Sequence, residues 1–463
     1  MQQNRSGRTG PGIVLVLLLT TLVMQGLWVG YAVAPDGVIT EASIRGHMEF
    51  LAGDALNGRG SGTRDEWVAA AYIASNLRRW NIEPLGDDGG YVQTVRINTN
   101  EATVPPTLSA GETVFTHGKE MIMQAIGPYH VSGPLVKISD GITAKAGAIV
   151  LLPEGAAPGP SISQAALVLS VETEQIRSRW EQLAARPAPI VPQLVTGAGE
   201  VPPRQGRIIL AREAYAALNA LPVSTVVKFD AETRLLRTSP TYNVVGRIAG
   251  SNPARSGEVI RLTAHLDHLG VRGNLDDKIY NGADDDASGV TAVLELAEAL
   301  AKGSPPERTV IFAWFGSEEA GGYGAAAFVA QPPVPLDRMV ANLEFEMIGR
   351  PDPAVAEHTL WLTGYERTNL GPELAKQGAR IVADPHPEQN FFMRSDNIQL
   401  ARAGVVAQTV SSFSLHADYH RPSDEVKNID FAHMRDSIQS MLAPVQWLAN
   451  SSFKPEWLPG MRP

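Results

Sequence analysis

The stretch from Glu258 to Gly324 decides the fold and contains EVIRLTAHLDHLG, NGADDDASGVTAVLELAEALAKG and RTVIFAWFGSEEAGGYG, in this order. The runs Val259 to Ala264 and Thr309 to Phe315 are short, apolar and partly β-branched, which predicts two buried strands. Between them, apolar residues recur at helical spacing from Ala287 to Ala301, which predicts an amphipathic helix. The alternation of strand and helix predicts an α/β fold.

Acidic and imidazole side chains follow or precede each of these elements. His265 and Asp267 come after the first strand, and Glu318 and Glu319 come after the second. The run 284–286 precedes the helix, at the end where the helix dipole stabilises carboxylates. One such cluster alone is usually solvated surface, because acids avoid burial unless they are paired or metal-bound. Three clusters, each beside its own element, instead predict a ligand site at the carboxyl edge of an open sheet.

These motifs resemble those of a known family. HLDHLG, GADDDASG and SEEAGGYG are similar to metal-site motifs of the M28 family of zinc aminopeptidases, and NLEFEMIGR and DYHRPSD resemble its fourth and fifth elements. All five occur in the order of the family. The resemblance implies a three-layer α/β/α zinc-peptidase domain with a mostly parallel sheet. It also implies an aminopeptidase, which removes N-terminal residues from peptides.

The resemblance implies a centre of two zinc ions. Asp285, the fourth residue of GADDDASG, would bridge the ions. One ion would take His265 and Glu346, and the other would take Glu319 and His420. Because the chain has no cysteine, histidine and carboxylate are the ligands available to zinc. Two such ions, about 3.5 to 4 Å apart, can share a water and hold the attacked carbonyl.

Three residues take catalytic roles from the same resemblance. Glu318 would be the general base that takes a proton from the metal-bridged water and passes it to the leaving amine. Asp267 would orient the ring of His265. Tyr419 would donate a hydrogen bond to the developing oxyanion, and packing against the sheet is an equal alternative for this residue.

Some positions depart from the pattern or leave a choice. His416 and His420 share a side of an extended segment, so His416 is a rival ligand, although the context YHRPSD favours His420. Glu346 stands where many members of the family have aspartate, so its carboxylate reaches one methylene further. Asn397, in RSDNIQ, stands where histidine is frequent.

A second carboxylate precedes Glu346 on its predicted strand. Side chains alternate along a strand, so Glu344 points to the same side as Glu346, roughly 7 Å away. One interpretation is a contact with the free α-ammonium of a peptide, which would favour aminopeptidase action. The other is an ion pair with an arginine such as Arg350, because buried carboxylates need a partner.

Length and composition limit the partners. A chain of 463 residues suggests two or three domains, and 44% hydrophobic with 19% charged residues is typical of globular proteins. The net charge of −10 disfavours nucleic acid and anionic membrane surfaces. Peptide substrates, which the resemblance implies, are therefore the expected partners.

The first 34 residues have the pattern of a targeting segment. Arg5 and Arg8 precede an apolar core from Ile13 to Met24, and Ala32 to Ala34 form a small-residue cleavage pattern, which predicts a signal peptide. Residues 12–34, taken as one apolar stretch, would also be long enough to remain as a membrane anchor. Both interpretations predict export, to the periplasm or out of the cell.

The remaining chain divides into three predicted parts. Residues 38–96 carry two predicted helices, capped by Thr40 and Thr63, and begin the peptidase domain. Residues 97–239 are richer in proline and glycine and predict an inserted, smaller β-rich α+β domain. This segment loosely resembles the protease-associated domain of many family members, and a spacer beside the cleft is an equal alternative. Residues 240–455 alternate strands and helices as the metallopeptidase catalytic domain.

Other functions stay open at this point. A carboxypeptidase of the same superfamily would use the same centre, since one sequence does not show which end of a peptide is recognised. A glutaminyl cyclase shares the fold but uses one catalytic zinc, which the full ligand set disfavours. A non-catalytic, receptor-like relative would have lost ligands, whereas all five and Glu318 are present.

Overall fold

The structure is a computed structural model that describes residues 39–127, 129–138, 144–156, 162, 164–195, 205–223, 225–273 and 276–463. The predicted targeting segment, residues 1–34, lies outside the described residues. Within the described residues, no helix combines the length and apolar character needed to cross a membrane.

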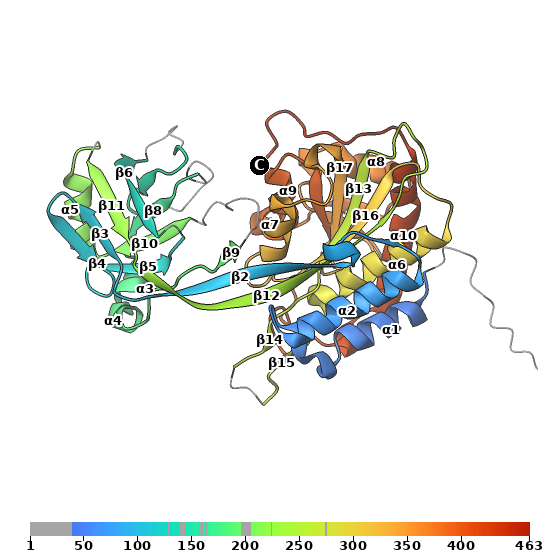
Figure 1. The fold of residues 1–463 in the computed structure, drawn as a ribbon, viewed down its shortest axis with the longest axis horizontal. Helices are drawn as coiled ribbons and strands as arrows, with labels where there is room; N and C mark the ends of the chain where they lie inside the picture. The colour runs from blue at the N-terminus through green and yellow to red at the C-terminus, as the bar shows by residue number, and fades with distance from the viewer. Residues whose placement is uncertain are drawn as a thin grey trace, which may run out of the picture. The chain divides into compact units, whose positions relative to one another are not determined.

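Among the described residues, ten strands form the larger of the sheets (Figure 1). Their order is β19-β18-β20-β17-β13-β16-β12-β2-β9, and β1 pairs with β12. The bounds are β1 Glu83–Pro84, β2 Val92–Ala102, β9 Gln193–Val195, β12 Thr233–Ile248, β13 Val259–His265, β16 Thr309–Phe315, β17 Met339–Phe345, β18 Leu360–Leu362, β19 Ile381–Ala383 and β20 Ala407–Ser411. The strands β13 and β16 match the runs predicted from sequence.

The centre of the ten-stranded sheet is parallel, and antiparallel pairs lie on both sides of it, although the outer pair β18 and β19 is again parallel. Strand β13 pairs in parallel with β16 and β17, and β17 with β20. Strand β12 is antiparallel to both β16 and β2, and β18 is antiparallel to β20. The prediction of a mostly parallel sheet is wrong for these antiparallel pairs. The chain leaves the sheet at Ala102 and returns opposite it at Thr233, so β2 and β12 must run in opposite directions.

Helices cover both faces of the ten-stranded sheet because side chains alternate along its central strands. Ile260, Leu262, Phe312 and Trp314 point into a core shared with α1, α2, α6 and α10. Ile311, Ala313 and Phe315 point into another core, shared with α7 and α9. The helix bounds are α1 Glu41–Leu51, α2 Arg64–Arg79, α6 Gly289–Lys302, α7 Tyr323–Ala330, α8 Leu370–Lys376, α9 Asn397–Arg402 and α10 Phe431–Asn450. Thr40 and Thr63 cap α1 and α2 as predicted.

In the described part of the chain, eight strands between residues 107 and 230 form a separate sheet in the order β4-β3-β11-β6-β7-β8-β10-β5. The bounds are β3 Thr107–Ala110, β4 Thr113–Thr116, β5 Met121–Ala125, β6 His130–Lys137, β7 Ile149–Leu151, β8 Leu167–Val171, β10 Gly206–Leu210 and β11 Val226–Asp230, with helices α3 Glu174–Arg177, α4 Trp180–Ala184 and α5 Arg212–Ala220. This eight-stranded sheet has its own apolar core. It falls within the predicted inserted domain, whose limits stay a prediction.

Candidate metal centre

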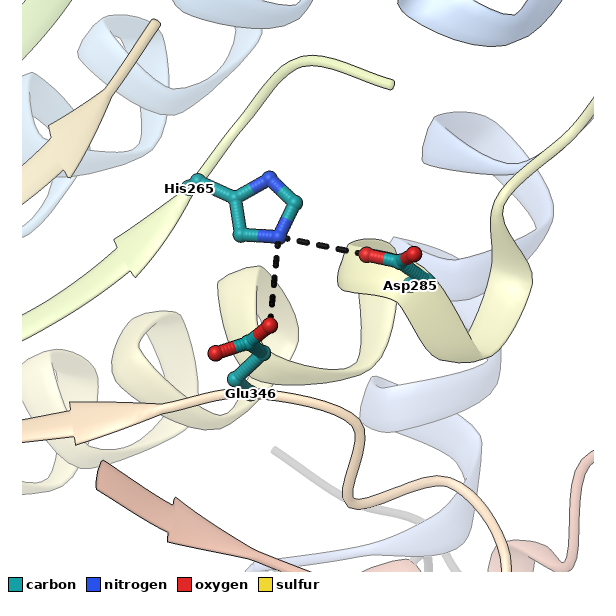
Figure 2. Close-up of side chains that lie close together, drawn as sticks. All are labelled: His265, Asp285 and Glu346. Atoms are coloured by element: carbon teal, nitrogen blue, oxygen red, sulfur yellow. Dashed lines mark ion pairs between the residues drawn. The ribbon is translucent and has the colours of Figure 1, made fainter. Parts of the chain in front are cut away.

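A first group of side chains that can bind a metal comes from the ends of two neighbouring strands and from one turn (Figure 2). His265 is the last residue of β13, Glu346 directly follows β17, and Asp285 lies in the turn Ala283–Ser288 before α6. Nε2 of His265 lies 3.2 Å from Oδ1 of Asp285 and 4.0 Å from Oε1 of Glu346. The three side chains are close enough to bind one cation. They meet because parallel strands end at the same edge of the sheet.

A second group shares Asp285. Nδ1 of His268 lies 2.7 Å from Oε1 of Glu319 and 3.8 Å from Oδ2 of Asp285, and these three can also bind a cation. His420 lies beside them, with Nε2 3.2 Å from Oδ2 of Asp285 and 3.3 Å from Oε2 of Glu319. The structure therefore brings all five predicted ligands together, with Asp285 between the two groups. It adds His268, which had no predicted role.

The residues of both groups fit a divalent metal. In the described part of the chain, Nε2 of His265, both ring nitrogens of His268 and Oε1 of Glu319 are buried without a hydrogen bond. Such unsatisfied buried atoms in a native structure call for an ion or a water. Several carboxylates this close together also repel one another unless cations lie between them. Histidine with carboxylate is a ligand set that suits zinc.

The protonation of the centre follows from burial and from these contacts. Burial alone would raise the pKa of Asp285, but the charge of His268 and the contacts with His265 and His420 hold this pKa well below its ordinary value. Burial raises the pKa of Glu318 well above its ordinary value, against the opposing charge of His265. The pKa of Glu319 is lowered as well, against its burial, by its contacts with His268 and His420. Asp285 and Glu319 are therefore ionised carboxylates, the form that binds a metal.

A tight turn after β16 presents Glu318 and Glu319. Ser317 has a left-handed φ of 56°, and the backbone N–H groups of Gly321 and Gly322 donate to the carbonyl of Glu318 at 2.7 and 2.9 Å. Oδ1 of Asp267 accepts the backbone N–H of Glu318 at 2.9 Å. The shortest contact of the His265 ring with Asp267 is from Nδ1 to the carbonyl oxygen, 3.2 Å, whereas Oδ1 is 3.8 Å away. The Asp267 carboxylate thus holds the turn that carries Glu318.

The segment after β20 separates the rival histidines. Nε2 of His416 contacts Oδ2 of Asp284 at 2.9 Å, whereas Nε2 of His420 contacts Asp285 and Glu319. The Tyr419 ring stacks on His420, with 3.9 Å between ring centroids, and lies 5.1 Å from the Phe413 ring. Burial raises the pKa of Tyr419 above its ordinary value, so its hydroxyl keeps its proton. Its two predicted roles, oxyanion contact and packing, are both compatible with this position.

Glu344 does not do what the sequence suggested. Its side chain is fully buried, and Oε2 accepts the backbone N–H of Asn397 at 2.5 Å and the hydroxyl of Thr409 at 3.3 Å. It does not line the pocket beside the ligands, so the predicted contact with a substrate ammonium is wrong. The predicted partner Arg350 pairs instead with Asp418, at 2.7 Å. Glu344 is buried because Asn397, the first residue of α9, covers this side of β17. This contact could not be predicted because Asn397 lies far from Glu344 in the sequence.

Asn397 also has a structural role. Its Nδ2 donates to the carbonyl oxygens of Phe392 and Ala407, at 3.2 and 3.4 Å. These bonds and the contact with Glu344 fix the start of α9 against β20. The amide of Asn397 therefore serves packing.

Two further residues without a predicted role fix the turn of Asp285. The guanidinium of Arg59 is fully buried and donates to four carbonyl oxygens, those of Leu51, Leu266, Asn281 and Gly282. Asp424 accepts the backbone N–H groups of Asp284 and Asp285, at 3.0 to 3.1 Å. Asp424 and His268 stand inside the motifs DYHRPSD and HLDHLG, so a signal was present. Arg59 had none, because its partners are backbone atoms far away in sequence.

A pocket opens beside the two groups. Asp285, Glu318, Glu319, Glu346 and His420 line part of it. Its aromatic walls are Trp361, Phe391, Phe413 and Tyr419. A concave site with apolar walls and convergent polar groups is the usual form of a site for a small ligand or a peptide end.

One comparison with known proteins concerns the sequence of the region that carries the centre. Residues 243–445 match the sequence model described as peptidase family M28. The matched range contains β13, β16, β17 and all five predicted ligands.

Several relatives are named as aminopeptidases. The chain is 38% identical over 119 residues to an aminopeptidase of Pseudomonas aeruginosa (strain UCBPP-PA14), a match that spans 25% of this chain and 20% of that protein. It is 22% identical over 421 residues to aminopeptidase YwaD of Bacillus subtilis (strain 168), which covers 87% of this chain and 84% of that protein.

Solved structures share the fold. An aminopeptidase from Aneurinibacillus sp. strain AM-1 aligns with a TM-score of 0.50 and 18% identity, over 92% of this chain and 96% of that one. BSAP, a zinc aminopeptidase from Bacillus subtilis, aligns with the same score and identity, over 90% and 97%. The likeness establishes a mixed α/β fold of the kind these enzymes have.

Proposed function

We propose that the protein is an exported aminopeptidase with two zinc ions in a three-layer α/β/α catalytic domain. The observation that carries this proposal is the position of Asp285 between two groups, each of which supplies a histidine and a further carboxylate. The match of residues 243–445 to peptidase family M28 supports peptide hydrolysis. The aminopeptidase names of the relatives support action at the N-terminus. Export rests on the sequence pattern of residues 1–34.

The five predicted ligands divide between the two ions. His265, Asp285 and Glu346 would hold one ion. Asp285, Glu319 and His420 would hold the other, and His268 would orient Glu319. When bound, two divalent ions lower the pKa of a shared water and polarise the attacked carbonyl. Nε2 of His265, which is buried without a hydrogen bond, is one of the donor atoms that this arrangement requires.

Glu318 is the proposed general base. It lines the pocket, precedes the ligand Glu319 and belongs to neither ligand group. It would accept a proton from the attacking water and deliver it to the amine nitrogen as the C–N bond breaks. The hydrogen bond from its backbone to Asp267 keeps its turn in place for both steps. Tyr419, at the pocket wall, would donate a hydrogen bond to the carbonyl oxygen of the substrate.

The test is hydrolysis of leucine p-nitroanilide by metal-loaded, chelator-treated and reconstituted protein. We expect a chelator to abolish hydrolysis and zinc or cobalt to restore it. N-acetylated leucine p-nitroanilide should resist, and N-blocked dipeptides with a free C-terminus should resist as well. Full activity after exhaustive chelation would contradict the metal assignment. Cleavage of the N-blocked dipeptides alone would instead identify a carboxypeptidase.

A further inference from the structure

The pocket beside the candidate metal centre contains a positively charged side chain, Arg394, that has no role in the proposed chemistry. Arg394 lines it together with Glu318, Glu319 and Glu346. This arginine follows the short turn Phe391–Met393, and its backbone N–H donates to the carbonyl of Phe391 at 2.9 Å. Its guanidinium lies over the Phe391 ring, 4.9 Å from the centroid. The turn therefore holds a cation at the pocket wall.

The side chain of Arg394 is free to bind a ligand. Within the described residues it is exposed, and it makes no ion pair and no hydrogen bond. Two other arginines near the centre, Arg59 and Arg350, already have partners. Arg59 donates to four carbonyl oxygens, and Arg350 pairs with Asp418 and Asp424 at 2.7 and 3.0 Å. Several carboxylates line the same pocket, yet none of them lies within ion-pair distance of Arg394.

We propose that Arg394 binds a carboxylate of the substrate and so directs the enzyme to peptides that carry one close to the cleaved bond. A guanidinium presents paired N–H groups that match a carboxylate, and it does so best when no other partner competes. The carboxylate has two sources: the free C-terminus of a dipeptide, or an acidic side chain of the N-terminal residue. The inference rests on the proposed function and adds its substrate class.

The experiment compares substrates that differ only in this charge. The dipeptide Leu-Ala has a free carboxylate and its amide, Leu-Ala-NH2, has none. The p-nitroanilides of glutamate and leucine differ in the acidic side chain. KM and kcat are measured with the metal-loaded wild type, with Arg394→Gln, which removes the charge, and with Arg394→Lys, which keeps it.

A matched control is Arg45→Gln. Arg45 is also exposed, and its guanidinium lies over a phenylalanine ring, that of Phe431, 3.8 Å from the centroid. It does not line the pocket. Loss of an arginine stacked on an aromatic ring is thus separated from loss of the cation at the site.

We expect Arg394→Gln to raise KM for one carboxylate substrate by about tenfold or more, the usual size of a hydrogen bond to a charged group. Its kcat, and both constants for the uncharged partner, should change less than about twofold, and Arg394→Lys should restore part of the loss. A loss with Leu-Ala identifies the C-terminal carboxylate, and a loss with the glutamate substrate identifies the side chain. Equal changes within both pairs overturn this inference alone. A metal-loaded wild type that cleaves none of these substrates overturns the proposed function, and the inference with it.

Discussion

The two sheets of this protein place charged residues at similar points, with different results. In the ten-stranded sheet, His265 ends strand β13, and Glu318 and Glu346 follow the parallel strands β16 and β17. In the eight-stranded sheet, strands β6, β7, β8 and β10 are also parallel, and Glu172 and Arg212 follow β8 and β10. Among the described residues, groups that could hold a metal occur beside the ten-stranded sheet and not beside the other.

The partners of the acids explain the difference. Glu172 contacts Arg177 at 3.4 Å and accepts the backbone N–H of Arg212 at 3.0 Å. Arg212 in turn pairs with Glu154 at 2.8 Å. In the ten-stranded sheet the acids face histidines and one another, and the nearest nitrogens are left without hydrogen bonds. In both sheets the ends of the strands bring charged side chains close together. Whether these side chains need a cation depends on whether the acids have basic partners, as Glu172 and Glu154 have.

The largest effect that tests this comparison is the loss of the shared ligand. Asp285→Asn should remove both ions and lower turnover by about 10³ or more, because one change weakens both groups. Metal content per chain and leucine p-nitroanilide hydrolysis measure it. The control Glu172→Gln removes an acid at the equivalent point of the eight-stranded sheet and should leave the metal content unaltered. An Asp285→Asn protein that still binds two ions would contradict the role of Asp285.

Removal of the proposed base should affect chemistry and not metal. Glu318→Gln is expected to lower kcat by about 10² or more while both ions stay bound, because Glu318 lies in neither ligand group. Parallel measurements of kcat and metal content decide the case. A variant that loses metal would mean that Glu318 and Glu319 have exchanged roles.

His268 should increase the metal affinity of the second group of ligands, because it contacts Glu319. His268→Ala is expected to weaken metal affinity there by about 10 to 100-fold, since a ring that contacts a ligand helps to orient it. Competition with a chromogenic chelator measures the affinity. His416, which contacts Asp284 outside both groups, supplies the matched variant His416→Ala, and its affinity should stay at the wild-type value. The opposite ranking would make His416 the ligand.

A smaller effect, on stability, is expected at Glu295. This buried carboxylate lies beside His47 and away from the candidate metal centre. Oε1 of Glu295, in α6, lies 3.8 Å from Nε2 of His47. Burial raises the pKa of Glu295 from 4.5 to about 7, and burial lowers the pKa of His47 to about 4. The stability that neutral Glu295 contributes is complete below pH 4.5 and is lost as the pH rises through about 7.

Glu295→Gln should therefore raise the free energy of unfolding at pH 8, by on the order of 2 kcal/mol, and change it little at pH 4.5. Denaturant unfolding at the two pH values measures the difference. Glu295 avoids the cost of a buried charge by taking up a proton, whereas the acids around Asp285 need a cation to balance their charge. A variant equally affected at both pH values would show that packing, and not ionisation, governs this site.

Local sequence patterns predicted the strands, the helix caps and many residues of the site. They could not predict contacts between segments that lie far apart in the sequence. The runs that became β13 and β16, and the caps Thr40 and Thr63, depend on neighbours in sequence and were predicted correctly. The antiparallel pairing of β2 with β12 joins segments more than a hundred residues apart, so no local pattern could show it.

Single side chains show the same limit. The alternation of β17 correctly put Glu344 on one side of the strand, but it could not show that α9 covers that side. In the same way, the motif contained His268 without revealing its contact with Glu319, which follows from the turn after β16.

Anomalous diffraction at the zinc edge, from crystals grown with zinc, would locate the ions directly. If two ions share Asp285, the map should contain two peaks on either side of it, about 3.5 to 4 Å apart, one beside His265 and Glu346 and the other beside Glu319 and His420. A single peak, or peaks away from Asp285, would contradict this arrangement.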